Sequence, residues 1–369
     1  MYVLVMSDAC IRNLSCSSDV SVDIDYGLLV EHSKGQTMKL SRILRPAIAM
    51  LVIGTALAAS VGTANASPIF VNHFDSTWTD GLLAKGVQAA TIAENELSSL
   101  FSNSVTVNIN FEATTATGLA DANFNGGNFP APYGPGGLTY AQVKTILTAH
   151  SLLHPENTAL ASTVANLPLL PPSCPSCIAQ PPQYMLPDAE QLALTGVGAG
   201  YTDQGFIRIN PTFNYDSDRS AIGGSQIDLV AVMLHEITHV MGRVNYAFAQ
   251  TSGNPFMTVM DLDRFNCGST TRNTVAANAC FSIDGGTTDI RKWSTTSDTG
   301  DWDSALASPN NAFVNFGQLT DLLSSDVINM NALGWDPAAA GVPEPASLLL
   351  VGLGLVGLGL GKPKMKGRK

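Results

Sequence analysis

The segment of residues 227–241 constrains the fold of this chain most strongly. Its apolar residues recur at helical spacing, and Gly242 stands where a helix commonly ends. The segment carries His235 and His239, four residues apart, with Glu236 directly after the first histidine. Because residues four apart lie on one face of a helix, both imidazoles can reach a single metal ion. The sequence therefore predicts a buried helix that presents two metal ligands on one side.

The H-E-x-x-H spacing also places a carboxylate beside the predicted ion. Zinc in a catalytic site keeps one open coordination position, where it lowers the pKa of a water molecule. A glutamate next to the first ligand can take the proton of that water as it attacks a peptide carbonyl. We therefore expect His235 and His239 to bind Zn²⁺ and Glu236 to act as the general base. A helix surface with two ordinary histidines is the alternative.

A catalytic zinc needs a third protein ligand, which the sequence specifies less clearly. In the extended metzincin pattern this ligand is a histidine six residues after His239, and Asn245 occupies that position. A carboxylate can replace the histidine, and Asp261 and Asp263 lie downstream. We expect Asp261 to bind the metal, with Asp263 as the alternative ligand and Arg264 orienting a carboxylate. Both aspartates also fit ordinary turn positions.

The N-terminal segment is expected to lie outside the folded domain. Residues 38–66 combine a basic start, an apolar run and small residues ending at Ala66, which is the pattern of a secretory signal peptide. The apolar run is shorter than the roughly 20 residues of a transmembrane helix, the alternative interpretation. Because signal peptides begin at the N-terminus, we interpret residues 1–37 as a misannotated leader that precedes a start at Met38. A cytoplasmic extension is the other interpretation of this leader.

The C-terminal segment, residues 342–369, has three parts. Val342-Pro343-Glu344-Pro345 is followed by an apolar, glycine-rich run and then by a basic end, an order that favours transient membrane association. These three parts resemble the PEP-CTERM sorting signal of Gram-negative bacteria. The resemblance implies export, processing by an exosortase, and delivery to the outer surface or the extracellular matrix. A plain C-terminal membrane anchor is the alternative.

The remaining residues, 67–341, have a length suited to one large domain. They contain 24 acidic and nine basic side chains, which gives a net charge of −15. Nucleic-acid binding needs a basic surface, so this charge argues against a nucleic-acid partner. Acidic turns at residues 284–289 and 298–303 could hold Ca²⁺, but neither matches a defined calcium loop, and solvated turns are the favoured interpretation.

Four cysteines lie in this predicted domain, an even number that indicates disulfides in an exported chain. Cys267 and Cys280 could close a short loop. Cys174 and Cys177 could bridge locally, although their spacing also suits a redox or zinc site. The proline-rich setting of this second pair favours a disulfide in a loop.

The periodicity of apolar residues indicates a mixture of helices and strands. The predicted helices cover residues 86–101, 140–153, 157–165, 227–241 and 319–333, and the predicted strands cover residues 105–111 and 205–210. This order favours an α+β domain that ends in an irregular C-terminal part. Similarity to zincins, in which an edge strand beside the metal helix can hold an extended substrate by β-pairing, implies this role for the strand at residues 206–210. His150 and His154 are four residues apart near a helix end, and we interpret them as ordinary residues.

Several blocks of the chain resemble a group of predicted zinc metalloproteases that carry PEP-CTERM tails. The similar blocks are residues 235–243, 261–265, 281–287 and 333–335. The resemblance implies a single zincin-like domain with a small twisted sheet and an active-site helix. It also implies an exported zinc endopeptidase that hydrolyses peptide or protein substrates, and it favours Asp261 over Asp263. The alternative is a non-catalytic surface or matrix protein on the same scaffold.

Overall fold

The structure is a computed structural model, and it describes residues 67–124, 137–172, 183–245, 256–273, 277–295, 298–303 and 305–339. The chain divides into a unit of residues 1–63 and a unit of residues 64–369, and every described residue belongs to the second unit. The predicted leader, signal peptide and sorting segment lie outside the described residues. The predicted bridge between Cys174 and Cys177 also lies outside them.

A four-stranded sheet lies beneath the predicted metal helix. Its order is β1 (Ile69–Phe74), β2 (Thr106–Ala113), β5 (Gly205–Ile209) and β3 (Ala120–Phe124). The first three strands run parallel, whereas β3 pairs antiparallel with β5 and forms one edge. Buried and less buried residues alternate along β2, as its sequence predicts.

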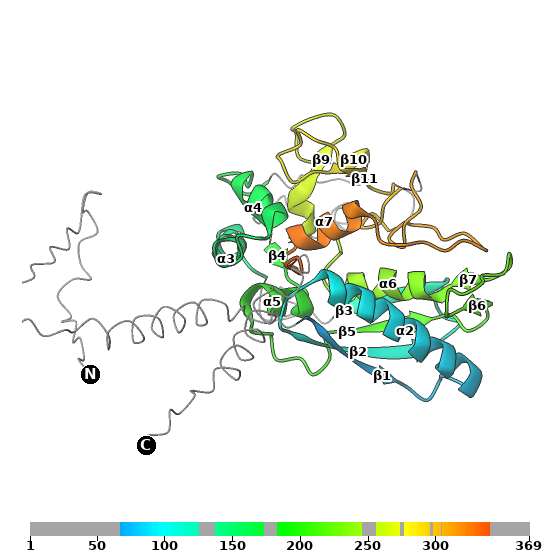
Figure 1. Cartoon of the computed structure of the whole chain (residues 1–369). Coiled ribbons are helices and arrows are strands. Elements are labelled where there is room, and N and C mark those ends of the chain that lie inside the picture. The colour runs from blue at the N-terminus through cyan, green and yellow to red at the C-terminus, as the bar shows by residue number, and fades with distance from the viewer. Residues whose placement is uncertain are drawn as a thin grey trace, which may run out of the picture. The chain divides into compact units, whose positions relative to one another are not determined.

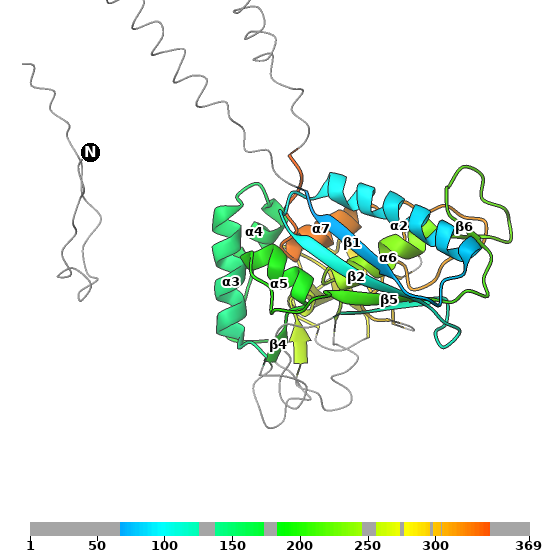
Figure 2. The ribbon, with the colours of Figure 1, turned by 90° about the horizontal axis from the view of Figure 1, so that it is seen from below.

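Two long helices cover the same face of this sheet (Figures 1 and 2). They are α2 (Asp80–Leu100) and α6 (Leu229–Val240), and they pack against each other. Every residue of α6 is buried except His235, which is only partly exposed. Asp228 caps the helix, because its carboxylate accepts a hydrogen bond from the amide of Ala231. The predicted helix is therefore confirmed, and its apolar residues fix it against the sheet.

Four further helices form a second group. They are α3 (Tyr140–Leu153), α4 (Thr158–Ala165), α5 (Asp188–Thr195) and α7 (Ser324–Ala332). α3 contacts α4 and α5, and α4 contacts α7. At the start of α3, Thr139 and Gln142 form a reciprocal capping box, which explains why the predicted boundary is accurate.

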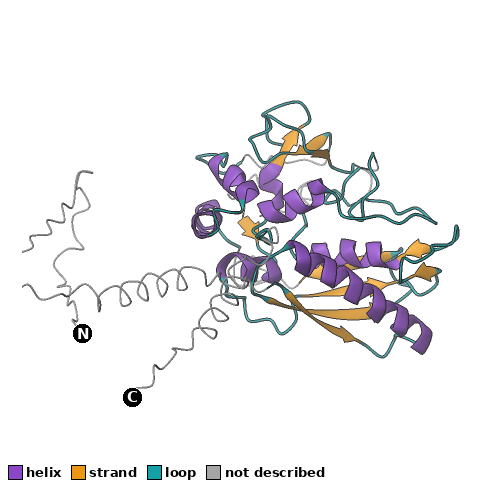
Figure 3. Ribbon diagram, viewed as in Figure 1, coloured by secondary structure: helices purple, strands orange, loops and turns teal. Residues whose placement is uncertain are grey.

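The remaining strands are short, and loops join them (Figure 3). The pairs are β4 (Gln183–Met185) with β8 (Phe256–Thr258), and β6 (Tyr215–Asp216) with β7 (Ile227–Asp228). A small antiparallel sheet contains β9 (Arg264–Asn266), β10 (Ala279–Phe281) and β11 (Arg291–Lys292), and the 3-10 helix η3 (Met260–Asp263) precedes it. The predicted disulfide between Cys267 and Cys280 is present and joins the residue after β9 to the middle of β10.

A tryptophan stack forms the core of the irregular C-terminal part. The rings of Trp293 and Trp302 are stacked with their centroids 4.0 Å apart, and both side chains are fully buried. Arg264 lies over Trp293, with 5.3 Å between its guanidinium carbon and the ring centroid. Trp302 donates a hydrogen bond of 2.6 Å from its indole nitrogen to Asp326. Aromatic packing therefore orders this part, where regular structure is sparse.

The mixed α+β class is confirmed, but the expected position of β5 is wrong. β5 lies inside the sheet, paired with β2 on one side and β3 on the other. Its backbone groups are used by these two neighbours, so β3 takes the edge position. The sequence also did not predict β1, β3 or α5. None of the described helices is long and apolar enough to cross a membrane.

Candidate metal centre

The helix α6 brings its two histidines together as the sequence predicts. The Nε2 atoms of His235 and His239 are 3.0 Å apart, and the two rings meet edge to face. Their second ring nitrogens are used elsewhere. Nδ1 of His235 lies 2.9 Å from the carbonyl oxygen of Pro309, and Nδ1 of His239 lies 2.6 Å from that of Arg243. A carbonyl can only accept, so each Nδ1 carries a proton.

This arrangement leaves the Nε2 atoms available as ligands. In a neutral imidazole with a protonated Nδ1, the Nε2 atom has a lone pair and no proton. Two such lone pairs at 3.0 Å repel each other unless a positive charge lies between or beside them. A proton on one ring or a metal ion can provide that charge. Backbone carbonyls that fix the tautomer in this way are typical of histidine metal ligands.

The third member of the cluster is Asp301. Its Oδ1 atom lies 3.6 Å from Nε2 of His235 and 3.3 Å from Nε2 of His239. Only 3% of Asp301 is exposed. The interpretation of residues 298–303 as a solvated turn is therefore wrong for Asp301, which is buried next to the stacked rings of Trp293 and Trp302. Its backbone carbonyl accepts a hydrogen bond of 2.8 Å from the amide of Ser294, beside Trp293 and Trp302.

A buried arginine supports Asp301 from the other side. Nη2 of Arg243 lies 2.9 Å from Oδ1 of Asp301, and Nη1 donates to the carbonyl of Gly300. Arg243 follows the C-terminal end of α6 directly after Gly242, whose positive φ of 115° turns the chain. Burial acts to raise the pKa of Asp301, but the charges of His235, His239 and Arg243 outweigh it and hold this pKa well below its usual range. The carboxylate is therefore ionised.

The other sequence-predicted ligands occupy different positions. Oδ2 of Asp261 accepts hydrogen bonds from the amide of Thr258, at 2.8 Å, and from its hydroxyl, at 3.2 Å. Oδ2 of Asp263 accepts one from the hydroxyl of Thr163, at 2.8 Å. Within the described part of the chain, the structure groups Asp301 and neither of these aspartates with the two histidines.

The structure therefore places Asp301, and not Asp261, beside the two histidines. η3 turns the Asp261 carboxylate back onto its own loop. Arg264, expected to orient a metal-binding carboxylate, instead donates a hydrogen bond of 2.9 Å from Nη1 to the carbonyl of Thr299. Thr299 lies two residues before Asp301, so Arg264 holds the loop that carries the carboxylate.

Glu236 lies with both histidines in the wall of a cavity of about 310 Å³. Residues 119–122 of β3 and the turn before it form another wall, and residues 307–315 close a third side. Burial is the largest influence on Glu236 and raises its pKa to about 8. The charge of His239 opposes this shift, and the charge of Asp301 adds to it. A strongly shifted carboxyl beside convergent polar groups is typical of an active site.

The two imidazoles titrate in opposite directions. Burial lowers the pKa of His235 to about 4, against the attraction of Asp301. Burial and Arg243 also act to lower the pKa of His239, but its hydrogen bond with Asp301 and the charges of Asp301 and Asp298 raise it overall. Of the two rings, His239 is therefore the one on which the surroundings favour a proton. A divalent cation competes with this proton.

The donor set fits zinc. Two neutral imidazole nitrogens and one carboxylate oxygen match the ligands of catalytic zinc sites, which take three protein ligands and leave one position open. Hydrogen-bond partners are present for each ligand: Pro309 for His235, the Arg243 carbonyl for His239, and the Arg243 side chain for Asp301.

The acidic turn at residues 284–289 uses its first carboxylate internally. Oδ1 of Asp284 accepts hydrogen bonds from the hydroxyl of Ser282 and the amides of Thr287 and Thr288. Asp289 accepts one from the amide of Gly268. These contacts are those of a turn, and Thr287, Thr288 and Asp289 are exposed, in agreement with the solvated turn that the sequence favours.

Comparison with known proteins identifies one end of the chain. Residues 341–362 match the model of the PEP-CTERM protein-sorting motif. No curated protein and no solved structure matches the chain. The match agrees with the resemblance of residues 342–369 to this signal. It indicates recognition by exosortase sorting machinery, C-terminal processing and sorting of a secreted protein to the cell envelope. The chain thus carries the sorting motif of exosortase-dependent exported proteins.

Proposed function

We propose that the protein is a zinc-dependent endopeptidase that acts outside the cell, at the outer surface or in the extracellular matrix. The convergence of His235, His239 and Asp301 beside Glu236, in the wall of one cavity, carries the proposal. The scaffold is then zincin-like, with α6 as the active-site helix above a small sheet. The sorting motif supports the location, because it indicates export.

In this proposal the three ligands hold Zn²⁺ and the neighbouring glutamate moves protons. A zinc ion there would polarise the scissile carbonyl, lower the pKa of water in its open position and favour the ionised form of Glu236. Glu236 takes a proton from the attacking water and delivers it to the amine leaving group. Its burial excludes competing solvent, so the carboxylate acts on a positioned water.

The edge strand β3 is the proposed binding site for the substrate main chain. Ala120, Asp121 and Ala122 line the cavity that contains Glu236. Among the described residues, β3 pairs with β5 along one side and has no strand along the other, where an extended peptide can pair. Recognition of this kind reads the backbone of a peptide, which suits a broad peptide or protein substrate.

The first experiment separates metal binding from catalysis. We expect Glu236→Gln to keep zinc and to lose cleavage of a peptide library by at least about 100-fold, because the amide cannot accept the proton of water. We expect Asp301→Ala to lose both the zinc of the α6 site and cleavage. Zinc is measured by metal analysis of the purified exported protein. Asp261→Asn is the matched control, and it should keep both properties because Asp261 lies away from the histidines.

The opposite results would contradict specific parts of the proposal. Cleavage that survives Glu236→Gln would remove the general base. Zinc retained by Asp301→Ala but lost by Asp261→Asn would restore Asp261 as the ligand. Zinc bound by the wild type with no cleavage of any peptide would favour the non-catalytic surface or matrix protein.

A further inference from the structure

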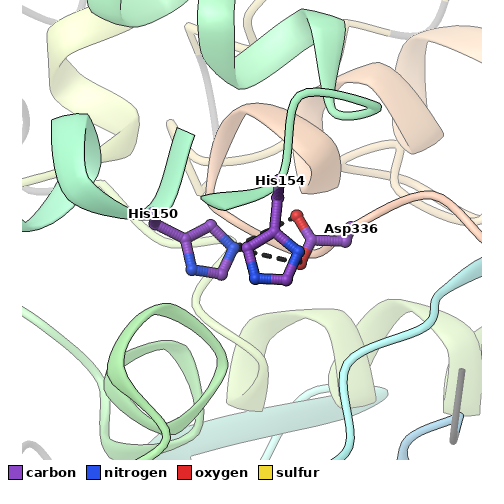
Figure 4. Close-up of side chains that lie close together, drawn as sticks. All are labelled: His150, His154 and Asp336. Atoms are coloured by element: carbon purple, nitrogen blue, oxygen red, sulfur yellow. Dashed lines mark hydrogen bonds and ion pairs between the residues drawn. The ribbon is translucent and has the colours of Figure 1, made fainter. Parts of the chain in front are cut away.

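A second group of ligand atoms shares no residue with the site on α6 (Figure 4). His150 comes from the last turn of α3, His154 caps the end of that helix, and Asp336 follows α7. Oδ2 of Asp336 lies 3.1 Å from Nε2 of His150 and 2.9 Å from Nδ1 of His154. The two rings stack with centroids 4.2 Å apart, and their edges face the carboxylate.

The partners of His150 determine which of its nitrogens can bind a cation. Its Nδ1 atom lies 2.9 Å from the carbonyl oxygen of Leu194, so Nδ1 carries a proton. In the neutral ring, Nε2 then has a lone pair, and both oxygens of Asp336 lie 3.1 Å from it. A lone pair that faces a carboxylate is repelled by it unless a cation or a proton lies at that position. Nδ1 of His154 lies 2.9 Å from Oδ2 of the same carboxylate, so it is a further possible ligand atom.

The carboxylate is itself held by buried amides. Nδ2 of Asn157 lies 3.0 Å from Oδ1 of Asp336, and Nδ2 of Asn103 lies 3.3 Å from Oδ2. Both asparagine side chains are buried. The hydrogen bond from the backbone amide of Asp336 to Oδ1 of Asn103, at 2.7 Å, fixes the same segment. Such partners orient first-shell ligands around metal ions.

The cluster is also open to solvent on one side. The His154 side chain is 37% exposed, whereas those of His150 and Asp336 are buried. Oε1 of Glu156, on the same rim, lies 3.2 Å from Nδ1 of His154. A cation can therefore enter past His154, and Glu156 or water can complete its coordination. Two imidazoles and one carboxylate favour Zn²⁺ over Ca²⁺ or Mg²⁺, which prefer oxygen ligands.

We propose that His150, His154 and Asp336 form a second zinc site, with a structural role. It shares no residue with the site on α6, so it does not depend on peptidase activity. Its ligands join the end of α3 to the segment after α7, where Pro337 also bridges to Phe101. The site replaces our sequence-based interpretation of both histidines as ordinary residues.

The test uses the purified exported protein with the α6 site removed by His239→Ala. We expect this variant to bind one equivalent of Zn²⁺ with a Kd below roughly 1 µM in competition with a chromophoric chelator. Adding His154→Ala should lower this affinity at least about 100-fold, because a ligand is lost. His154 is partly exposed, so its replacement should leave the fold intact by circular dichroism. The matched control adds His73→Ala, because His73 is an exposed histidine on β1. This variant should still bind one equivalent of Zn²⁺.

Two results would overturn the proposal. The folded His239→Ala variant could bind no zinc, or it could keep its zinc after His154→Ala. If His239→Ala does not fold, the wild-type protein gives the same comparison. It should bind two equivalents, and His154→Ala should bind one. If His154→Ala binds as many equivalents of Zn²⁺ as the wild type, the second zinc site is equally excluded.

Discussion

At the scale of single residues, buried carboxyl groups divide into two kinds. Asp301 is ionised because three positively charged or ionisable groups surround it. Asp263 is equally buried but has one hydroxyl partner, Thr163. Burial therefore raises the pKa of Asp263 from 3.8 to about 7, while that hydrogen bond and the charge of Arg272 oppose the shift. The pKa values of the two aspartates are thus shifted in opposite directions, although both side chains are buried and both lie in acidic segments.

We predict that Asp263→Asn stabilises the protein at neutral pH. A folded-state pKa of about 7 means that the folded protein holds a proton that the unfolded chain releases above about pH 4. The free energy of unfolding therefore falls as the pH rises from about 4 to 7, by an amount on the order of 4 kcal/mol. The amide of asparagine does not titrate and still accepts from Thr163. Urea denaturation from pH 4 to pH 8 should show a smaller decline in the variant.

Asp321→Asn is the control for this prediction, because the Asp321 side chain is 80% exposed. It should leave the pH dependence of stability unchanged. An equal decline in Asp263→Asn and the wild type would show that Asp263 is ionised in the folded protein at neutral pH.

The residues of the candidate centre differ in how far the sequence predicts them. His235, Glu236 and His239 belong to one helix, so their spacing alone places them on one face. Asp301 lies 58 residues along the chain from Arg243, its buried partner. Its position depends on the stacking of Trp293 and Trp302, a tertiary contact that leaves no periodic pattern in the sequence. The adjacent residues Asp301 and Trp302 are the one local feature that could have indicated a buried carboxylate here, and such a pair also occurs in ordinary turns.

At the scale of elements, the edge strand determines how a substrate can bind. The amide of Asn210 donates to the carbonyl of Leu119, so this pair is hydrogen-bonded across β3 and β5. Such pairs alternate with pairs whose backbone groups point outward. By this alternation, the backbone groups of Ala120 and Ala122 point away from β5. They are the groups that can pair with a peptide.

We predict that Ala122→Pro impairs cleavage and spares the metal site. Proline removes an outward amide and no hydrogen bond to β5, a position where edge strands tolerate it. Loss of one hydrogen bond to the substrate should lower kcat/KM by about 2- to 10-fold. Zinc content should stay at the wild-type level. Steady-state cleavage of a peptide substrate and metal analysis check both statements.

Ala122→Ser keeps the amide and is the matched variant. It should cleave the same peptide at close to the wild-type rate. If Ala122→Pro cleaves as fast as Ala122→Ser, the substrate main chain does not pair with β3 at this residue.

The elements also show where sequence patterns are sufficient. α3 and α6 have clear caps and apolar spacing, and their predicted boundaries are close to the observed ones. β3 has the sequence Ala-Asp-Ala-Asn-Phe, which alternates apolar and polar residues but is short and contains Ala, Asp and Asn, residues that are depleted in strands. Its pairing with β5 therefore comes from tertiary structure. The position of β5 inside the sheet could not be predicted either, because strand order is not encoded in local periodicity.

At the scale of the whole molecule, export and the disulfide are connected. A bridge between Cys267 and Cys280 forms and persists in an oxidising compartment. The sorting motif indicates that the protein leaves the cytoplasm. The bridge closes a loop of 13 residues, which constrains the unfolded chain.

We predict that replacing both cysteines by serine lowers stability by about 3 kcal/mol, the value for a loop of this size. For a domain of this length, the melting temperature should fall by roughly 6–12 °C. Thermal melts of the oxidised wild type, the reduced wild type and the double serine variant measure this change. The reduced wild type and the variant should melt together. A variant that melts like the oxidised wild type would show that the bridge does not stabilise the exported protein.

The tryptophan stack also has an optical consequence. Trp302 is the chain neighbour of Asp301, and its ring lies 4.0 Å from that of Trp293. We expect an ion that binds the Asp301 carboxylate to change the surroundings of this indole, because the two residues are adjacent in the chain. Ultraviolet emission from two indoles in such close contact depends on their mutual orientation. The molecule therefore contains an intrinsic chromophore adjacent to its proposed reaction centre, through which occupancy can be followed without a dye.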